Sequence, residues 1–390
     1  MHTAYIVAAT RTAGGRSNGR LKDWHPADLA GKVLNRLVAQ TGVDPDAIDD
    51  VILGCVSQAG EQSNNIARYS VLASGLPESV PATSVDRQCG SSQQAVHFAA
   101  QAVMTGTMDI VFAAGVESMT RVPMGTPVKG AMELGLGGPM SPGIQARYPG
   151  VKFSQFRGAE TIARKHGLTK EMLDRFSYDS HRKAIAATQG GKFEAEILPI
   201  EITTATGEAD LHRVDEGIRF SVTLEGIQNV KLLEEGGLLT AAVSSQICDG
   251  AAGVVVVNEN GLKRLGIEPL ARIHHMTVAG GDPVIGLEAP LEATRRALAK
   301  AGMSVDQIDL YEVNEAFAPI PLAWLKALDA DPARLNIHGG AISLGHPLGA
   351  SGAKLMTTLI YALRDRGKRW GLQTMCEGGG QTNVTIIEAL

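Results

Sequence analysis

Short apolar runs alternate along the chain with longer segments of helical periodicity. The runs YIVAA, DVILGCV, DIVFAAG and GVVVV have the length of single strands and are apolar almost throughout, as expected for strands covered on both faces. The stretch LAGKVLNRLVAQTG instead places its apolar residues at helical spacing. This alternation of buried strands and amphipathic helices predicts an α/β fold.

One part of this pattern occurs twice, 260 residues apart. DAIDDVILG begins at Asp46 and DQIDLYEVN begins at Asp306, and each follows an amphipathic helix. The same offset carries the helical stretch that begins at Gln93 onto the one that begins at Ala353. A repeated order of helices and strands at a fixed offset predicts that an α/β domain has been duplicated.

Residues 120–245 interrupt the repeat. They begin with a glycine- and proline-rich stretch, GTPVKGAMELGLGGPMSPG, and continue into a helical stretch near Thr169. We interpret them as an inserted loop or lid domain, which either contributes ligand contacts or is a solvated loop without function. The N-terminal half then covers residues 1–119, completed by 246–268, and the C-terminal half covers 269–390.

Composition and charge are those of a soluble globular protein. The 390 residues are 44% hydrophobic and 20% charged with a net charge of −5, and no basic run or zinc-finger spacing points to nucleic acid. A strand-like run starts almost at the first residue, which leaves no room for a signal peptide, and no stretch approaches the roughly 20 apolar residues of a membrane span. The cysteines lie far apart without metal-ligand spacing. We therefore expect a cytoplasmic protein with no metal site and no membrane contact.

The stretch QCGSSQQA places Cys89 directly before the helix at Gln93. A helix N-terminus can lower the pKa of a thiol and hold an oxyanion. In the second half, the matching place is occupied by GGAISLGHPLGASG, where Pro347 and the flanking glycines suit a His346 imidazole that faces a ligand. Cys89 is either a nucleophile or a packed thiol, since cysteines are often simply buried.

Two further blocks carry reactive or polar groups. Cys376 precedes EGGG, whose glycines expose backbone amides, and VNEAFA places Asn314 and Glu315 at the end of an apolar strand, where a hydrogen-bonded turn is the simpler interpretation.

The blocks QCGSSQQA, NEAFA, GGAISLGHPLGASG and CEGGGQTNVTIIE occur in the order found in thiolases, and the chain resembles that family over essentially its whole length. The resemblance implies two duplicated βαβαβαββ-type halves in a five-layered α-β-α-β-α arrangement with an inserted loop domain.

The resemblance also implies an activity, the CoA-dependent cleavage of 3-ketoacyl-CoA to acetyl-CoA and a shortened acyl-CoA. By resemblance, Cys89 is the nucleophile that receives the acyl group, His346 is the base that takes its proton, and Cys376 is the acid and base of the carbon chemistry. Asn314 would position a water that forms an oxyanion hole with His346, and the N–H groups of Cys89 and Gly378 would form a second one. A ping-pong reaction through an acyl-cysteine, reversible as a Claisen condensation, follows from these roles.

For CoA, which is a co-substrate here and not a tightly bound cofactor, the resemblance implies four contacts. Arg219 would lie near the adenine, Ser245 along the pantetheine, and Ala316 and Phe317 along the tunnel. Apart from the family, Arg219 is equally well a surface salt-bridge residue and Phe317 a core aromatic. Thiolases are homodimers or homotetramers, and the strand before DRQCG would form the central contact.

Some positions depart from the family pattern. Ser154 and Gln155 stand where short-chain thiolases have the histidine and methionine of HMGxTAE, and Gly286 stands where many relatives have a methionine. Smaller side chains in these places favour a larger acyl group, as in bacterial degradative thiolases that act on steroid or other bulky acyl-CoAs.

His338 stands where an asparagine is usual, and it either tunes the site near His346 or replaces one hydrogen-bonding side chain by another. We favour the second interpretation. Cys248 and Cys55 are expected to be packed thiols.

Three alternatives compete with a degradative thiolase. A biosynthetic thiolase would run the same chemistry toward acetoacetyl-CoA, and ketoacyl synthases share the fold but lack a second cysteine, so Cys376 argues against them. An acyl-CoA-binding relative without catalysis is the third, and it has no need of two reactive thiols.

Overall fold

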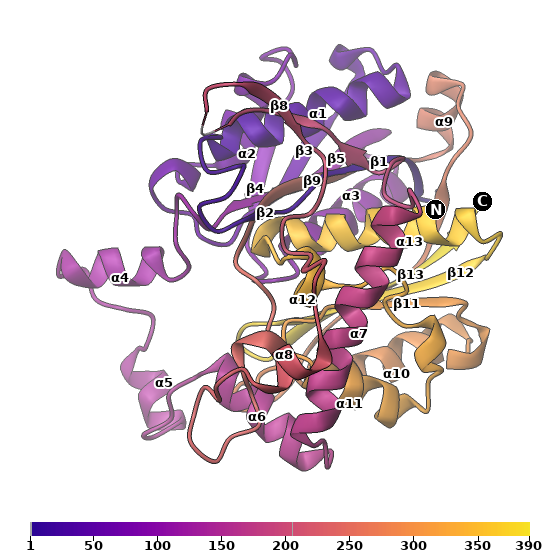
Figure 1. Cartoon of the computed structure of the whole chain (residues 1–390). Coiled ribbons are helices and arrows are strands. Elements are labelled where there is room, and N and C mark those ends of the chain that lie inside the picture. The colour runs from indigo at the N-terminus through magenta and orange to yellow at the C-terminus, as the bar shows by residue number, and fades with distance from the viewer. Residues whose placement is uncertain (1, 205) are drawn as a thin grey trace.

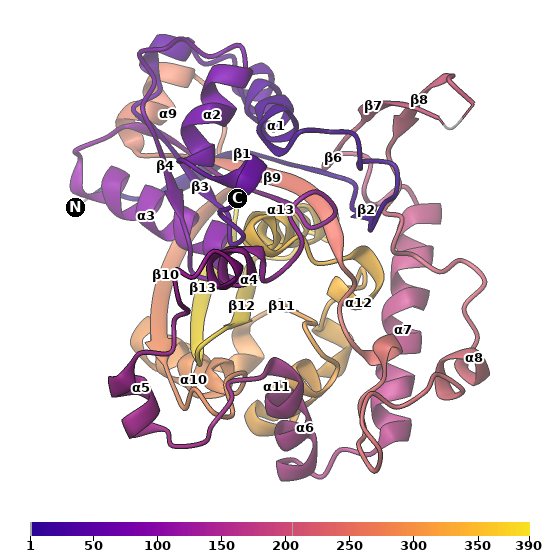
Figure 2. The same cartoon turned by 90° about the vertical axis from the view of Figure 1, so that its left-hand side faces the viewer.

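The computed structural model describes residues 2–204 and 206–390. Its main β-sheet of 11 strands consists of two continuous halves, called here the N-terminal and the C-terminal sheet, and three layers of helices are interleaved with them (Figures 1 and 2). The strands of the N-terminal half are β1 (Tyr5–Thr12), β2 (Gly15–Arg16), β3 (Asp50–Gly54), β4 (Ala82–Val85), β5 (Ile110–Ser118) and β9 (Cys248–Val257). Those of the C-terminal half are β10 (Ala271–Gly280), β11 (Leu310–Val313), β12 (Trp370–Glu377) and β13 (Gln381–Ala389).

The order β1-β9-β5-β3 of the N-terminal half matches the order β10-β13-β12-β11 of the C-terminal half, and β4 extends the path in the N-terminal half. The hydrogen-bonded path is β11-β12-β13-β10-β1-β9-β5-β3-β4, and β1 and β10 join the two sheets through the pairs Tyr5–Arg272 and Ile6–Ala271. In the N-terminal half β3 runs parallel to both β4 and β5, in the C-terminal half β11 runs parallel to β12, and antiparallel strands follow in both halves. The predicted duplication is confirmed.

The 260-residue offset holds for individual elements. Helix α3 (Ser91–Thr105) and helix α13 (Ser351–Asp365) begin and end 260 residues apart, and β5 and β12 begin at the same offset. The structure therefore repeats the spacing that the apolar runs predict.

The helices form three layers around the two sheets. Helices α1 (Pro26–Thr41) and α2 (Ile66–Ala73) cover the outer face of the N-terminal sheet, and α10 (Ala289–Ala301) and α11 (Pro319–Leu328) cover that of the C-terminal sheet. The central layer, α3 and α13, lies between the sheets, as Figure 2 shows around α13. The predicted five-layered arrangement is confirmed. The remaining helices of the two halves are the short α9 (Glu259–Leu265) and α12 (Ala341–Leu344).

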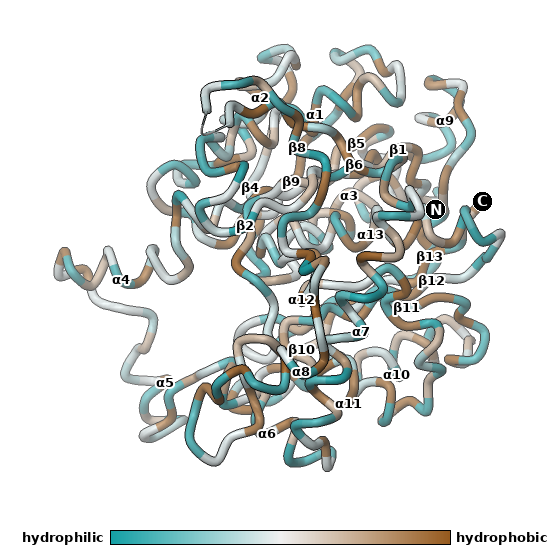
Figure 3. The backbone as a smooth tube through the Cα atoms, viewed as in Figure 1, coloured by the Kyte–Doolittle hydropathy of each residue, from teal (hydrophilic) through white to brown (hydrophobic). Residues whose placement is uncertain are grey.

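The central strands are covered on both faces, as their unbroken apolar runs predict. Every residue of β5 and β9 is buried, and the hydrophobic colour gathers along β5 and its neighbours in Figure 3. Such strands leave no room for polar side chains except near their ends. The polar chemistry of the chain is therefore expected at strand ends and in the turns that follow.

The inserted segment between β5 and β9 has its own small elements. They are α4 (Thr126–Glu133), α5 (Pro142–Arg147), α6 (Gln155–Lys165), α7 (Lys170–Gln189), β6 (Ile197–Leu198), β7 (Ile200–Thr203), β8 (Ala209–His212) and α8 (Leu224–Gln228). Helix α6 packs on α11, and α7 packs on α12 and α8, whereas α4 projects from the body (Figure 1). The boundaries 1–119, 120–245, 246–268 and 269–390 stay a prediction. No helix among the described residues is long and apolar enough to cross a membrane.

The two central helices approach so closely that a glycine is required between them. A Cβ atom on Gly352 of α13 would overlap the backbone nitrogen of Gln93 in α3 and lie 2.7 Å from its Cβ. We expect Gly352→Ala to lower the free energy of unfolding by about 1–3 kcal/mol through overpacking. Gly130 of α4 is the matched control, because nothing lies within 4 Å of its Cβ position. Urea unfolding of both variants measures the difference, and equal stabilities would contradict this packing.

Candidate active site

Cys89 lies in a sharp turn between β4 and α3. Gln88, the residue before it, has a left-handed backbone with φ of 50°. Three hydrogen bonds hold this turn: the Gln88 N–H donates to Asp86 Oδ1 (2.7 Å), the Arg87 N–H to Ser91 Oγ (2.9 Å), and the Ser91 hydroxyl to the Gln88 carbonyl (2.6 Å). Cys89 itself is 4% exposed. The turn thus fixes the thiol at the N-terminal end of a buried helix.

His346 lies in the matching turn of the second half, between α12 and α13. Its Nδ1 atom lies 2.5 Å from Ser351 Oγ, and the Ser351 hydroxyl donates to the Pro347 carbonyl (2.8 Å). Because that hydroxyl proton is already used, Nδ1 is the donor, and Nε2 is the acceptor. Burial and the charge of Lys354 lower the pKa of His346 to about 3, so the imidazole is neutral at physiological pH.

Asn314 follows β11 and faces the same imidazole. Its Nδ2 atom lies 3.4 Å from His346 Nε2, and its backbone N–H donates to the Thr374 carbonyl (3.1 Å). The Oδ1 atom is buried and has no partner in the part of the chain that the structure describes. Asn314 and His346 are therefore held side by side by the ends of two different elements.

Cys376 and Gly378 lie at the end of β12, against the nucleophile turn. A Cβ atom on Gly378 would lie 2.8 Å from Gln88 Oε1. Burial raises the pKa of the Cys376 thiol, and the nearby Cys89 raises it further. Leu348, two residues after His346, packs with Cys89 in one small apolar cluster. The structure therefore gathers the sequence-predicted residues Cys89, Cys376, Gly378, His346 and Asn314 where the two halves meet.

The pKa of Cys89 differs from the sequence-based expectation. Burial and the Glu377 carboxyl raise the pKa of this thiol to about 12, although the thiol lies at a helix N-terminus. The expectation of a lowered pKa is wrong, because burial of the thiolate away from water raises the pKa by more than the helix N-terminus lowers it. Burial also raises the pKa of Glu377 to about 8, against the opposing charge of Arg87. The carboxyl is thus largely protonated at neutral pH.

Sequence reasoning missed Glu377. It occupies the same position at the end of β12 that Glu117 occupies at the end of β5, 260 residues earlier. Neither of its carboxyl oxygens has a hydrogen-bond partner among the residues with a described position. The internal repeat was the signal that could have drawn attention to this pair.

Arg219 lines a cavity of about 220 Å³ with Ser177, His181, Ser244 and Gln246, among others. Ser245 lies between two of these lining residues, and its N–H donates to the Ala316 carbonyl (2.9 Å). Ser244 and Phe317 form an isolated β-bridge.

Ala316 and Phe317 lie behind the wall of this cavity. They are 4% and 5% exposed, and Phe317 packs edge-on against Phe156 at 5.3 Å between ring centroids. Of the four residues predicted to contact CoA, Arg219 therefore lines the cavity, and Phe317 is also a core aromatic.

A second cavity, of about 180 Å³, lies beside Gly378, two residues after Cys376. Ser154, Gln155, Gly286 and Gly378 all line it, together with Phe153, Pro283, Leu287 and Gly379. The three positions that depart from the family pattern thus share one wall with a predicted oxyanion-hole residue. Replacing a methionine by Gly286 enlarges this space.

The other singled-out residues are packed. His338 is 5% exposed and stacks edge-on with Phe193 at 5.8 Å, which fits a structural role. Cys55 and Cys248 are buried free thiols. Within residues 2–204 and 206–390, no three His, Cys, Asp or Glu side chains are grouped as metal ligands would be.

Comparison with known proteins decides the family. The family model for the thiolase N-terminal domain matches residues 4–260, and the one for the thiolase C-terminal domain matches residues 267–389. The chain belongs to the thiolase family. It is therefore an acyltransferase with the thiolase fold.

Relatives support a degradative thiolase. The chain is 50% identical to a steroid 3-ketoacyl-CoA thiolase, FadA6, of Mycobacterium tuberculosis, with 100% of this chain and 95% of that protein covered. It is 41% identical to a 3-ketoacyl-CoA thiolase of Pseudoalteromonas translucida, with 100% and 99% covered. Among solved structures, the Bacillus anthracis acetyl-CoA acetyltransferase matches with a TM-score of 0.91 and 34% identity, covering 100% of this chain and 99% of that one. These relatives support the assignment of the chain as a 3-ketoacyl-CoA thiolase.

Proposed function

We propose that this thiolase cleaves 3-ketoacyl-CoAs with bulky acyl groups, with Cys89 as nucleophile, His346 as its base and Cys376 as the second acid and base. The observation that carries the proposal is that Cys89 and Cys376 lie close together at the junction of the two halves, with Leu348, two residues after His346, packed in the same cluster as Cys89. A cavity lined by Ser154 and Gly286 adjoins Gly378.

The first step is acyl transfer to Cys89. His346 Nε2 accepts the thiol proton as Cys89 Sγ attacks the 3-keto carbon, so that proton transfer and C–S bond formation occur together and no free thiolate precedes the attack. The N–H groups of Cys89 and Gly378 hold the oxyanion that forms at the keto oxygen. Its collapse breaks the C2–C3 bond and leaves the acyl group on sulfur.

The electron pair of the broken bond passes to the thioester as an enolate. Asn314, through an ordered water, and His346, which now carries the proton, stabilise the enolate oxygen. Cys376 then donates its proton to C2, and acetyl-CoA leaves. The buried Asn314 amide beside His346 supports this assignment.

The second half-reaction uses the same groups. The Cys376 thiolate takes the proton of a second CoA thiol, whose sulfur attacks the acyl-cysteine carbonyl. The C–S bond to Cys89 breaks, and the sulfur regains its proton from His346. Each proton and electron pair returns to its starting group, so the enzyme is restored after one thiolysis.

CoA is proposed to occupy the cavity beside Arg219, with Arg219 near the adenine. Ser245 lies along the pantetheine, and Ala316 and Phe317 shape the passage to the thiols. The backbone hydrogen bond between Ser245 and Ala316 supports a common wall for these residues.

A homodimer or homotetramer is proposed for assembly. Strand β4 is the last strand of the sheet path and leads directly into the Cys89 turn, so its free edge suits the central contact with a second copy. Four unpaired buried cysteines favour a reducing compartment such as the cytoplasm.

The proposed function is tested by intact-mass spectrometry and peptide mapping after incubation with short, medium and ring-containing acyl-CoAs. We expect an acyl adduct on Cys89 and, with CoA and a 3-ketoacyl-CoA, release of acetyl-CoA. An adduct on another residue, or none from any acyl-CoA, would contradict the assignment.

The preference for bulky acyl groups predicts the effect of Gly286→Met. The added side chain fills the second cavity, and we expect kcat/KM for ring-containing 3-ketoacyl-CoAs to fall about ten- to a hundredfold, while that for acetoacetyl-CoA is unchanged. Gly286 has φ of 72°, so any side chain strains its backbone, and Gly286→Ala is the control that carries this strain without the bulk. Equal losses in both variants would show that strain, not acyl size, is responsible.

A further inference from the structure

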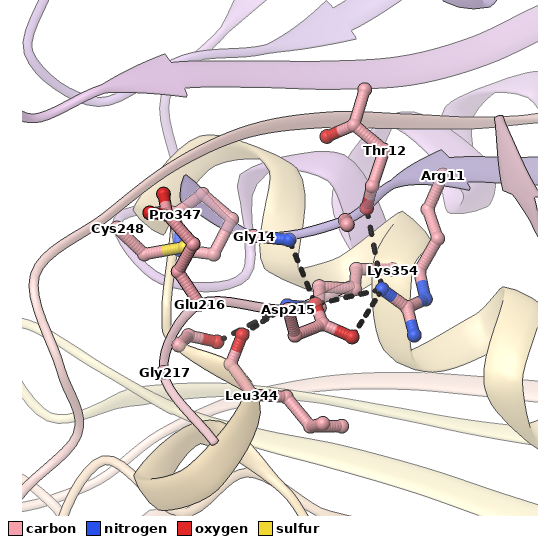
Figure 4. A network of polar contacts seen from close by, with 12 residues as sticks. Arg11, Thr12, Gly14, Asp215, Glu216, Gly217, Cys248, Leu344, Pro347 and Lys354 are labelled. Carbon is pink, nitrogen blue, oxygen red and sulfur yellow. Dashed lines mark hydrogen bonds and ion pairs between the residues drawn. The ribbon is translucent and has the colours of Figure 1, made fainter. Parts of the chain in front are cut away.

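Four charged side chains form a buried network beneath the His346 turn. Arg11 comes from β1, Glu196 and Asp215 from the inserted segment, and Lys354 from α13. Their side chains are between 0% and 5% exposed. Figure 4 shows Arg11 and Lys354 converging on Asp215, with Leu344 beside them.

The Asp215 carboxylate accepts hydrogen bonds from groups other than Lys354. The Arg11 Nη1 atom donates to both of its carboxylate oxygens (2.9 and 3.1 Å), and the Gly14 N–H donates to Oδ1 (2.7 Å). Burial alone would raise the pKa of Asp215, but the charges of Arg11 and Lys354 lower it to about 2. The carboxylate is therefore ionised, and Arg11 alone contributes two of its hydrogen bonds.

Lys354 makes its shortest contact elsewhere. Its Nζ atom donates to the Leu344 carbonyl at 2.6 Å, whereas Asp215 Oδ1 lies at 3.3 Å and the Gly345 carbonyl at 3.5 Å. Leu344 is the last residue of α12, and Gly345 directly precedes His346. The ammonium thus holds the carbonyls that lead into the histidine.

Helix α13 holds His346 at two points. Ser351, at its first turn, orients the imidazole ring through Nδ1, and Lys354, one turn later, fixes the backbone before the ring. The ion pair between Lys354 and Asp215 attaches this arrangement to the inserted segment. A shift of this backbone moves Nε2 relative to Cys89, and misplacement of a base by about 1 Å costs rate steeply.

We propose that Lys354 is a positioning residue for His346, and that its ion pair with Asp215 connects the inserted segment to the His346 turn. This inference rests on the proposed role of His346 as the base of acyl transfer. Lys354 touches neither substrate nor thiol and acts through the His346 turn.

Lys354→Met, Lys354→Gln and Lys354→Arg test this role by the rate constant of Cys89 acylation in a single turnover, followed by intact mass. We expect Lys354→Met to lower that rate constant about ten- to a hundredfold, while the acyl-CoA concentration at half-maximal rate stays within about twofold. Lys354→Arg keeps a cationic donor and is expected to restore most of the rate.

Lys192→Met is the matched control. Lys192 pairs with Asp365 at the far end of the same helix at 2.9 Å, but in an exposed position, so its replacement should leave acylation unchanged. Rates are normalised to the concentration of folded protein, so that a variant which is merely less stable does not count as a slower one.

Parent-like acylation in Lys354→Met would overturn the proposal. If that variant does not fold, Lys354→Gln decides, because its side chain is polar but neutral and one bond shorter, which withdraws the donor from the Leu344 carbonyl: a slowed rate supports the positioning role, and an unchanged rate overturns it. Failure of the parent chain to acylate Cys89 would instead overturn the proposed function.

Discussion

Replacement of Cys89 by alanine is expected to lower thiolysis by about a thousandfold or more, because the variant lacks the sulfur that forms the acyl-enzyme bond and Cys376 is assigned to proton transfer. The variant should still bind CoA, since the cavity at Arg219 lies in other elements. Steady-state kinetics measure the loss, and a CoA-binding titration confirms that the substrate site persists.

Cys55→Ala is the control for this substitution. Cys55 is a fully buried thiol at the end of β3, in the same half as Cys89, and it has no role in the proposed steps. We expect its turnover to match that of the parent chain. A Cys89→Ala variant that still accumulated an acyl adduct would contradict Cys89 as the nucleophile.

Replacement of Glu377 by glutamine is expected to stabilise the chain increasingly as pH rises. The folded state holds the Glu377 proton up to a pKa of about 8, whereas a glutamate in the unfolded chain has its ordinary pKa of 4.5. The parent chain therefore loses stability between these two pH values, since the unfolded state releases a proton that the folded state keeps. Glutamine carries no titrating proton. The gain in unfolding free energy should grow by roughly 3 kcal/mol between about pH 5 and pH 8.

Glu117→Gln is the matched comparison from the other half. The Glu117 carboxyl accepts hydrogen bonds from the N–H groups of Val56, Ser57 and Gly349 and from the Gln62 amide. The NH₂ group of a glutamine at this position would face N–H donors and could not accept their hydrogen bonds, so we expect destabilisation at every pH. Urea unfolding of both variants across the pH range gives the comparison. A pH-independent effect of Glu377→Gln would contradict the raised pKa.

The architecture could be predicted from the sequence because each strand and helix has its own local hydrophobic pattern, and because the order of these patterns occurs twice in the chain. Apolar runs predict strands such as β5 and β9, and the repeat at a fixed offset predicts that α3 and α13 are equivalent helices. The motif blocks in family order predicted the cluster of Cys89, His346 and Cys376. None of these inferences needed a distance between remote residues.

Other features of the site depend on tertiary contacts that no local pattern records. The thiol pKa of Cys89 is set by burial among residues such as Leu348 and Met375, far along the chain. The contact of Lys354 with Asp215 joins positions 139 residues apart. The left-handed backbone at Gln88 falls on a residue type that rarely adopts it, so it could not be anticipated.

The strand order has a consequence for how the chain folds as it is synthesised. Strand β9 lies between β1 and β5, yet it follows the whole inserted segment in sequence. Until residue 257 has left the ribosome, β1 lacks its main partner and β5 has an open edge. Long-range pairing of this kind slows folding and exposes strand edges to aggregation in the meantime. The N-terminal half therefore exposes the edges of β1 and β5 until β9 has been synthesised.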